Sequence, residues 1–478
     1  MQLVAGYTEE YPDAPQNGVK LVAQEPVSTF SIDVDTASYA NTRRFLKDGH
    51  LPPRAAVRIE ELVNYFDYGY ARPASAETPF RATTALVASP WSKERQILHI
   101  GLQGYDLPRG EQPPLNLVFL VDTSGSMASE DRLPLAKKSL NLLVDQLDKD
   151  DHVSIVAYAG SAGEVLPPTN GGEKVKIRRA LDALTARGST AGGEGLALAY
   201  RLAQENFDKV AVNRVILLTD GDFNVGIDDP EKLKDFIAEK RKSGIYLSAY
   251  GFGRGNYNDV MMQALAQTGN GTAAYIDTMQ EARKLLRDDL AGSLFPIADD
   301  VKIQIEFNPA RVAEYRLIGY ETRLLAREDF NNDKVDAGEI GSGVSVTALY
   351  EITPVGAKTS SDPLRYQDQG ATTRESGELA FLKVRYKEPG GTTSKLIEQA
   401  ISSDALATVD AAPEATRWAI AVAGFGERLR GSPWVADSFG LDEIVALAQK
   451  ARGEDEFGLR AEFVQLVRAA KEAKSINE

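Results

Sequence analysis

The central part of the sequence alternates between short apolar runs and longer segments with apolar residues at helical spacing. Residues 115–121 (LNLVFLV) and 214–218 (RVILL) are continuous apolar runs, which are typical of strands covered on both faces. Further strands and helices alternate along the same region, with strands at 153–158, 245–250 and 272–276 and helices at 133–147, 175–184, 196–204, 230–242, 259–267 and 280–290. This alternation predicts an α/β fold with a doubly wound, mainly parallel sheet over residues 113–297.

The pattern changes on both sides of this region. Residues 301–307 alternate strictly between apolar and polar positions, which indicates a half-buried antiparallel strand. Similar short strands are expected at 80–87, 96–102, 315–320, 344–352 and 378–386. Because a hairpin alone is only marginally stable, we expect the strands near 80–102 to pair with those of a β region at 298–393. The α/β domain would then be inserted in an antiparallel β-sandwich base with flanking helices.

The remaining segments predict a tether and two regions that contain helices. Residues 1–28 carry Pro, Asn and Gln in place of an apolar pattern, which predicts a flexible tether. Residues 29–112 form an N-terminal region in which a strand at 30–35 and two helices precede the strands. Residues 394–478 are expected to be helical. The helices of these two regions are predicted at 36–47, 54–66, 396–400, 414–428, 441–451 and 458–473.

Composition narrows the chemistry that this chain can carry out. The 478 residues include 54 Lys and Arg against 69 Asp and Glu, and the net charge of −15 argues against nucleic acid as a partner. The absence of Cys excludes disulfides, zinc–thiolate sites and thiol nucleophiles. No stretch reaches the roughly 18 apolar residues that a transmembrane helix needs, and the first residues show no signal-peptide pattern. Oxygen ligands, and the hard cations that they bind, are the chemistry that remains.

Oxygen-bearing side chains follow two of the predicted buried strands. Asp122, Ser124 and Ser126 come directly after the strand at 115–121, and Asp220 follows the strand at 214–218. Thr190 lies in a Gly-rich loop between them, ahead of a helix. Because the carboxyl ends of parallel strands meet at one edge of a sheet, we expect these side chains to lie close together. Carboxylate and hydroxyl oxygens suit a small divalent cation that keeps several waters.

These five positions match the metal-ion-dependent adhesion site (MIDAS) of von Willebrand factor A (VWA) domains, whose pattern is D-x-S-x-S, then a Thr, then an Asp. Residues 30–70 (FSIDVDTASYANTRRFLKDGHLPPRAAVRIEELVNYFDYGY) resemble the segment before the A domain in bacterial VWA proteins of the YfbK type. Residues 324–352 (LLAREDFNNDKVDAGEIGSGVSVTALYEI) resemble the C-terminal domain of unknown function in the same family. The resemblance implies a Rossmann-like VWA fold for the central domain.

The resemblance also implies a function that does not involve catalysis. The five oxygen-bearing residues would hold Mg²⁺, or Mn²⁺ or Ca²⁺, and an acidic side chain of a protein partner would complete the coordination of the ion. A shift of the helix at 280–290 with metal occupancy is the usual switch of such domains. Members of the family typically carry a lipoprotein-type export signal, which implies a place in the cell envelope, periplasmic or on the outer surface, and a lipid anchor on the full-length precursor.

Two other functions are consistent with part of the pattern. An envelope scaffold could use the metal only to stabilise its fold, and partner capture that survives chelation would favour it. A Mg²⁺-dependent phosphohydrolase of the haloacid-dehalogenase kind also places an Asp after the first strand. That chemistry needs a second carboxylate two residues later as acid and base, and this sequence has Ser124 there.

Three further patterns are weak. Residues 251–256 (GFGRGN) imitate a dinucleotide loop, but Asn256 replaces the third glycine, so we expect only a loop at the sheet edge. Residues 329–336 imitate the start of a calcium loop, but Lys334 stands where such a loop needs Gly, which favours an acidic turn. The three histidines lie far apart in sequence, and structural roles are expected for them.

Overall fold

The computed structural model describes residues 9–188, 192–221, 230–360 and 377–475. The chain divides into two compact units, each assembled from segments that are far apart in sequence. The first comprises Met1–Pro12, Asp35–Ala40 and Leu107–Pro296, and the second comprises Asp13–Val34, Asn41–Asp106 and Ile297–Glu478.

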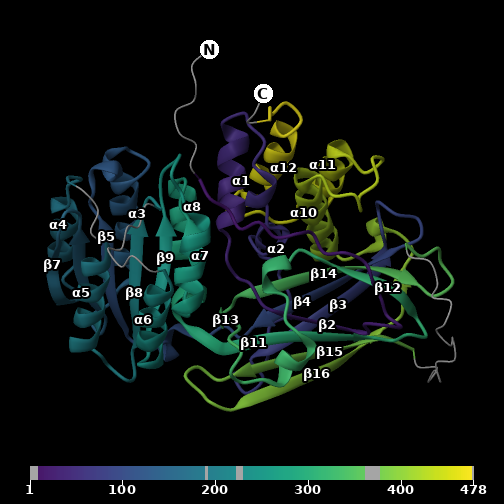
Figure 1. Ribbon diagram of the computed structural model, residues 1–478, viewed down its shortest axis with the longest axis horizontal. Helices are drawn as coiled ribbons and strands as arrows, with labels where there is room; N and C mark the ends of the chain where they lie inside the picture. The colour runs from purple at the N-terminus through teal and green to yellow at the C-terminus, as the bar shows by residue number, and fades with distance from the viewer. Residues whose placement is uncertain (1–8, 189–191, 222–229, 361–376, 476–478) are drawn as a thin grey trace. The chain divides into compact units, whose positions relative to one another are not determined.

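The first unit is built on the six-stranded sheet shown at the left of Figure 1, in the order β10-β9-β8-β5-β6-β7. Its strands are β5 (Leu115–Asp122), β6 (His152–Tyr158), β7 (Ala162–Asn170), β8 (Val212–Thr219), β9 (Ile245–Gly251) and β10 (Ala273–Tyr275). All neighbouring pairs are parallel except β6 and β7, so the sheet is mainly parallel as predicted. The sequence did not predict β7, which contains Pro167 and Pro168 and lies at the sheet edge, where proline is tolerated.

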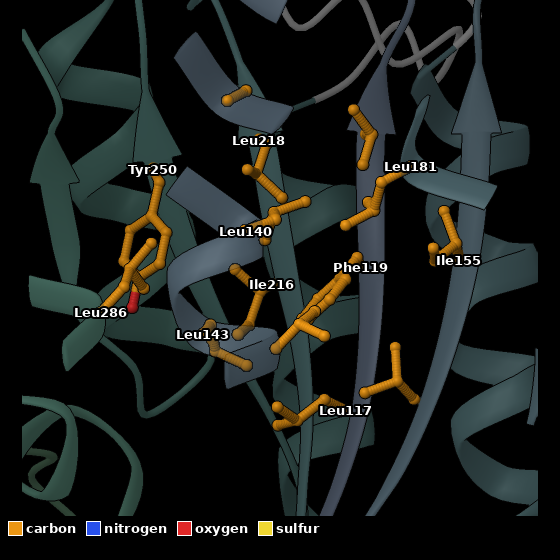
Figure 2. Close-up of a cluster of buried hydrophobic side chains, with 14 of the residues drawn as sticks. Leu117, Phe119, Leu140, Leu143, Ile155, Leu181, Ile216, Leu218, Tyr250 and Leu286 are labelled. Atoms are coloured by element: carbon orange, nitrogen blue, oxygen red, sulfur yellow. The ribbon is translucent and has the colours of Figure 1, made fainter. Parts of the chain in front are cut away.

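Helices cover both faces of this sheet (Figure 1). They are α3 (Leu133–Gln146), α4 (Lys174–Ala183), α5 (Gly192–Glu205), α6 (Pro230–Lys242), α7 (Asp259–Thr268), α8 (Met279–Arg283) and α9 (Leu290–Leu294). Alternate residues of β5 point to opposite faces: Phe119 belongs to the core under α3, and Leu120 belongs to the core under α5. Figure 2 shows Phe119 packed with Leu140, Leu143 and Ile216. Full burial of such a side chain stabilises the fold by about 1.5–3 kcal/mol.

The closing helix of this unit differs from the single helix predicted at 280–290. A π-helix over Lys284–Asp288 separates α8 from α9. Its wider turn is marked by the bond from the Asp289 N–H to the carbonyl of Lys284, five residues earlier, at 2.7 Å. The helical character was therefore predicted correctly, and the irregular turn was not.

The second unit contains an antiparallel sandwich. One sheet has the order β1-β12-β14-β4-β3-β17, and the other has β13-β11-β15-β16 with β2 paired to β11. The first sheet comprises β1 (Lys20–Leu21), β3 (Phe80–Ala88), β4 (Gln96–Gly104), β12 (Val312–Ile318), β14 (Ser345–Pro354) and β17 (Ala405–Leu406). The second comprises β2 (Val27–Ser31), β11 (Pro296–Phe307), β13 (Gly338–Gly341), β15 (Glu378–Lys387) and β16 (Ser394–Ser402).

The predicted pairing across the insertion is present. Leu98 of β4 lies opposite Tyr350 of β14 in an antiparallel register, so strands on either side of the α/β region share one sheet. Ile100 from this sheet and Ile303 and Val384 from the other belong to one buried cluster, which makes the two sheets a sandwich.

Two predictions for this unit were wrong. The helix expected at 396–400 is part of strand β16, where Ile397 lies opposite Val384 of β15. Its Leu, Glu, Gln and Ala residues favour a helix locally, but pairing with β15 determines the structure. The tether expected over 1–28 is also wrong in the described residues, because β1 and β2 pair with β12 and β11, and Glu10 forms a parallel bridge with Asn258. The first eight residues lie outside the described part of the chain.

Helices complete the second unit. They are α1 (Ala37–Lys47), whose first residues belong to the first unit, α2 (Ile59–Val63), α10 (Glu414–Arg430), α11 (Leu441–Lys450) and α12 (Leu459–Ala469). The helix predicted at 54–66 is instead a short 3-10 helix at Arg54–Ala56 followed by α2. Trp418 of α10 is buried between Phe66 and Phe463, with ring centroids 5.2 Å from each. None of the helices in the described residues has the length and apolar character to span a membrane.

Candidate metal centre

The first predicted ligand, Asp122, is the last residue of the buried strand β5. Its side chain is fully buried. Oδ1 accepts a hydrogen bond from the backbone N–H of Ser124 at 2.8 Å, and Oδ2 accepts one from the Thr219 hydroxyl at 3.2 Å. The chain then turns into a 3-10 helix at Gly125–Ala128, which brings the hydroxyl oxygens of Ser124 and Ser126 within 3.0 Å of each other. One carboxylate and two hydroxyls of the predicted set are therefore gathered in one turn.

The second loop lies directly beside this turn. The N–H of Arg187 donates to the carbonyl of Thr123 at 2.7 Å, and the N–H of Gly125 donates to the carbonyl of Gly188 at 3.0 Å. Thr190, the ligand predicted in this loop, lies outside the described residues. The structure thus places the residues just before Thr190 against the first loop.

The third loop begins where β8 ends. Asp220 follows Thr219 and is fully buried. Because β8 is the parallel neighbour of β5, the two carboxylates come from adjacent strand ends. Asp220 is close enough to Asp122 to raise the pKa of that carboxyl. The four described residues of the predicted set therefore belong to adjacent loops at one edge of the sheet.

Arg132 is a residue of this region that the sequence did not reveal. It precedes α3, and its Nη1 donates to Oδ2 of Asp220 at 2.8 Å and to the carbonyl of Ser126 at 2.7 Å. Its Nη2 donates to the carbonyl of Arg254 at 2.7 Å and to Oδ1 of Asn256 at 2.8 Å. No local pattern marks an Arg for such a role, since its partners are up to 124 residues away in sequence.

The charges of the site fit a cation. The pKa of Asp122 is raised to about 6, mainly by burial and also by the negative charge of Asp220, while the bonds from Ser124 and Thr219 lower it. Arg132 compensates Asp220, but no ion pair to Asp122 occurs among the residues that the structure describes. A buried carboxylate is stable only when it is paired, protonated or bound to a metal. The carboxylates and hydroxyls are hard ligands of the kind that Mg²⁺ prefers.

The described residues hold no group of three or more Asp, Glu or His side chains arranged to bind a metal. The contacts of the acidic loop at 329–336 show why this loop does not form a calcium site. The ammonium group of Lys302 donates to the carbonyls of Asp329 (3.0 Å) and Asn332 (2.7 Å), and that of Lys387 donates to the carbonyl of Asp333 at 3.0 Å. Lysine side chains therefore occupy carbonyls that a calcium ion would use, in line with the acidic turn that the sequence favours.

His99 has a structural environment. It is buried between the hydroxyls of Tyr70, 2.7 Å from Nε2, and Thr416, 2.9 Å from Nδ1. Burial lowers the pKa of His99 to about 3, so the ring is neutral and serves as a hydrogen-bonding core residue.

Three stretches of the chain match known families. The von Willebrand factor type A domain matches residues 116–288, a von Willebrand factor family matches residues 5–99, and the C-terminal family of the uncharacterized protein YfbK matches residues 292–473. The uncharacterized protein YfbK of Escherichia coli is 47% identical over 479 residues, which cover 98% of this chain and 82% of that protein. The chain belongs to the YfbK family. The VWA domain of this family member is of a type that often mediates protein interaction and metal-dependent adhesion.

Solved structures also match this YfbK-family chain. A von Willebrand factor type A protein from Catenulispora acidiphila is 15% identical, covers 86% of this chain and 99% of its own, and has a TM-score of 0.45. Proximal thread matrix protein 1 from the mussel byssus, described with a zinc-occupied MIDAS motif, is 23% identical, covers 39% of this chain and 46% of its own, and has a TM-score of 0.31.

Proposed function

We propose that this chain is a protein-binding module that depends on a divalent cation and catalyses no reaction. The observation that carries the proposal is the arrangement at the strand ends: the buried Asp122 carboxylate, the Ser124 and Ser126 hydroxyl oxygens 3.0 Å apart, and Asp220 on the adjacent strand. Together with Thr190, these residues would hold the ion. The proposed ion is Mg²⁺, with Mn²⁺ or Ca²⁺ as the alternatives, because all three prefer oxygen ligands.

When bound, the ion would supply an open coordination position for an anionic oxygen. An acidic side chain of a protein partner fits this position, since a carboxylate can replace a water on the ion. The local charge supports this choice even though the whole chain carries −15. Asp122 and Asp220 balance a divalent ion, and Arg132 adds one positive charge beside Asp220, so the occupied centre favours an anion.

The residues argue against the hydrolytic alternative. A phosphohydrolase of this layout needs a proton donor and acceptor two residues after the first Asp, and the hydroxyl of Ser124 has a pKa far too high for that role. The family resemblance to exported proteins supports the cell envelope, periplasmic or outer surface, as the place of action, with a lipid anchor on the precursor.

Calorimetric titration with Mg²⁺ and Mn²⁺ tests the metal centre. Asp122→Ala should abolish cation binding, and Thr190→Ala should weaken it. Asp131→Ala is the matched control, because this partly buried carboxylate lies in the same loop and accepts a hydrogen bond from the Ser129 hydroxyl. An Asp122→Ala isotherm equal to that of the wild type would reject the ligand assignment.

Partner capture tests the function itself. Immobilised wild-type protein should retain envelope proteins in Mg²⁺ and release them in chelator, and Asp122→Ala should retain none. Retention that chelator does not change would favour the scaffold in which the metal only stabilises the fold. Turnover of generic phosphate esters by the wild type, lost in Asp122→Ala, would favour the phosphohydrolase.

A further inference from the structure

The loop between β9 and α7, residues 252–258, contacts Arg132 from one side. In sequence this loop resembles an imperfect dinucleotide-binding motif, but its glycines have structural roles. Gly253 has φ +77°, and a Cβ at this position would overlap the side chain of Arg132, so the guanidinium stem lies directly against the backbone. The loop also caps α7, because Oδ1 of Asn258 accepts a hydrogen bond from the N–H of Met261 at 2.9 Å.

A single peptide group of this loop carries two hydrogen bonds in opposite directions. The carbonyl of Arg254 accepts from Nη2 of Arg132 at 2.7 Å. The N–H of Gly255 donates to Oε1 of Glu9 at 2.8 Å. This carbonyl and this N–H belong to the same planar peptide unit, so they can only turn together. Loss of either partner removes one of these two constraints on the peptide, and Gly255 at φ +92° has no Cβ to restrict its rotation.

Glu9 is held in place by its own segment. Its Oε2 accepts from the hydroxyl of Tyr11 at 2.6 Å. The next residue, Glu10, pairs with the loop through its backbone: its N–H donates to the carbonyl of Tyr257 at 3.1 Å, and its carbonyl accepts from the N–H of Asp259 at 2.9 Å. Residues 9–11 therefore lie on the loop as a short parallel bridge, within the same compact unit as Arg132.

The contacts form a continuous connection from Glu9 to Asp220. Glu9 orients the peptide between Arg254 and Gly255, this peptide orients Arg132, and Nη1 of Arg132 orients Oδ2 of Asp220 at 2.8 Å. The planar guanidinium binds with both of its amino groups, which fixes its orientation in a way that a lysine ammonium cannot. Groups that orient metal ligands in this way typically tune metal affinity by about 10- to 100-fold.

We propose that Arg132 and Glu9 are positioning residues of the metal centre, and that docking of residues 9–11 and cation binding strengthen each other through the peptide between Arg254 and Gly255. The inference rests on the proposed function, because it needs a cation at Asp220. Thermodynamic linkage makes the effect reciprocal: what docking adds to cation affinity, the cation adds to docking. The N-terminal segment thereby acts on a site that it does not touch.

Calorimetric titration of the full chain with Mn²⁺ tests this proposal. Arg132→Lys keeps the positive charge but loses the planar guanidinium that binds with two amino groups. The affinity of this variant for Mn²⁺ should fall about tenfold. Glu9→Ala should lower the affinity about fivefold, and Glu9→Gln, which still accepts from Gly255, should lower it less. Glu10→Ala is the matched control, because it removes the same charge from the same segment while its side chain contacts only Asn258 among the described contacts. Equal affinities of Glu9→Ala and Glu10→Ala would overturn the proposal.

Hydrogen exchange without added cation separates this inference from the proposed function. Arg132→Lys should speed amide exchange in residues 253–257 although Arg132 does not bond to the Gly255 N–H, and strand β9 should exchange as in the wild type. Unchanged exchange in 253–257 would overturn the linkage even if metal binding were lost. If Arg132→Lys exchanges faster but the wild-type protein binds no cation, the connection from Arg132 to the loop would stand. The proposed function, and the coupling to a cation that rests on it, would then be overturned.

Discussion

The hydroxyl of Thr219 donates a hydrogen bond to Oδ2 of Asp122 at 3.2 Å and so joins the ends of two adjacent parallel strands. Both residues are fully buried. This bond lowers the pKa of Asp122 and fixes the direction of its carboxylate. Thr219 is thus an orienting partner of the proposed metal ligand and not a member of the predicted ligand set.

The first prediction concerns this bond. Thr219→Val keeps the shape of the side chain and removes the donor, so Asp122 should lose its orientation and its pKa should rise. Mn²⁺ affinity measured by calorimetry should fall about tenfold. Thr169→Val is a suitable control, because Thr169 is a buried threonine of the same sheet that bonds to the carbonyl of Pro167. A Thr219→Val affinity equal to that of the control would contradict the role of this bond.

The second prediction concerns Gly253. In Gly253→Ala, the new methyl group would push Arg132 away from Asp220, and a left-handed backbone costs about 1–2 kcal/mol for any residue with a Cβ. Both cation affinity and the free energy of unfolding should therefore fall. Gly356→Ala isolates the backbone effect, since Gly356 has φ +92° with no atom near the added Cβ. Gly356→Ala should lose stability and keep full cation affinity. If it lost as much cation affinity as Gly253→Ala, displacement of Arg132 could not be the cause of that loss.

The third prediction uses the buried carboxyl of Glu60 in α2. The pKa of Glu60 is raised from 4.5 to about 8, mainly by burial and also by the nearby carboxylates of Glu321, Asp33 and Glu61. The folded protein then keeps this proton to a higher pH than the unfolded chain. The contribution of Glu60 to stability is complete below pH 4.5 and is lost as the pH rises towards 8, by at most about 1.4 kcal/mol per pH unit.

Glu60→Gln provides the measurement, because the amide oxygen can still accept from the N–H of Tyr320, which lies 2.9 Å from Oε2 of Glu60. Denaturant unfolding at several pH values between 5 and 8 should give a flatter stability curve for the variant than for the wild type. Parallel curves over this range would show that Glu60 does not titrate there.

The fourth prediction concerns the buried charges under α10. Arg316 donates to Oε1 of Glu427 at 2.7 Å and to Oε2 of Glu351 at 3.3 Å, and all three side chains are at most 3% exposed. Arg316→Met would leave two buried carboxylates without this partner, which should cost about 3–5 kcal/mol in the free energy of unfolding. Lys450→Met breaks an exposed pair with Asp410 and should cost no more than about 1 kcal/mol. Similar losses for the two variants would contradict the importance of burial here.

The sequence predicts best where local patterns and burial agree. The continuous apolar run at 115–121 is strand β5, buried along its full length, and the polar residues that follow it lie at the sheet edge as expected. Strand β16 was missed because its residues favour a helix locally, and its pairing with the preceding strand β15 holds them in a strand. Arg132 was missed for a related reason: its role is defined by four partners that no sequence spacing connects to it. In both cases contacts between elements determined what the local pattern could not.

The pairing of β4 with β14 has a consequence for how the chain folds. Leu98 and Tyr350 are neighbours in one sheet, yet most of the α/β region is synthesised between them. Until β14 leaves the ribosome, one edge of the β3–β4 hairpin has no strand to pair with, and such an edge is prone to aggregation. Rapid folding of the inserted region would shorten the effective loop and reduce the entropy lost when the sandwich closes. Maturation of the sandwich should therefore be the slow, late step, and substitutions that delay the insert should lower the yield of the whole protein.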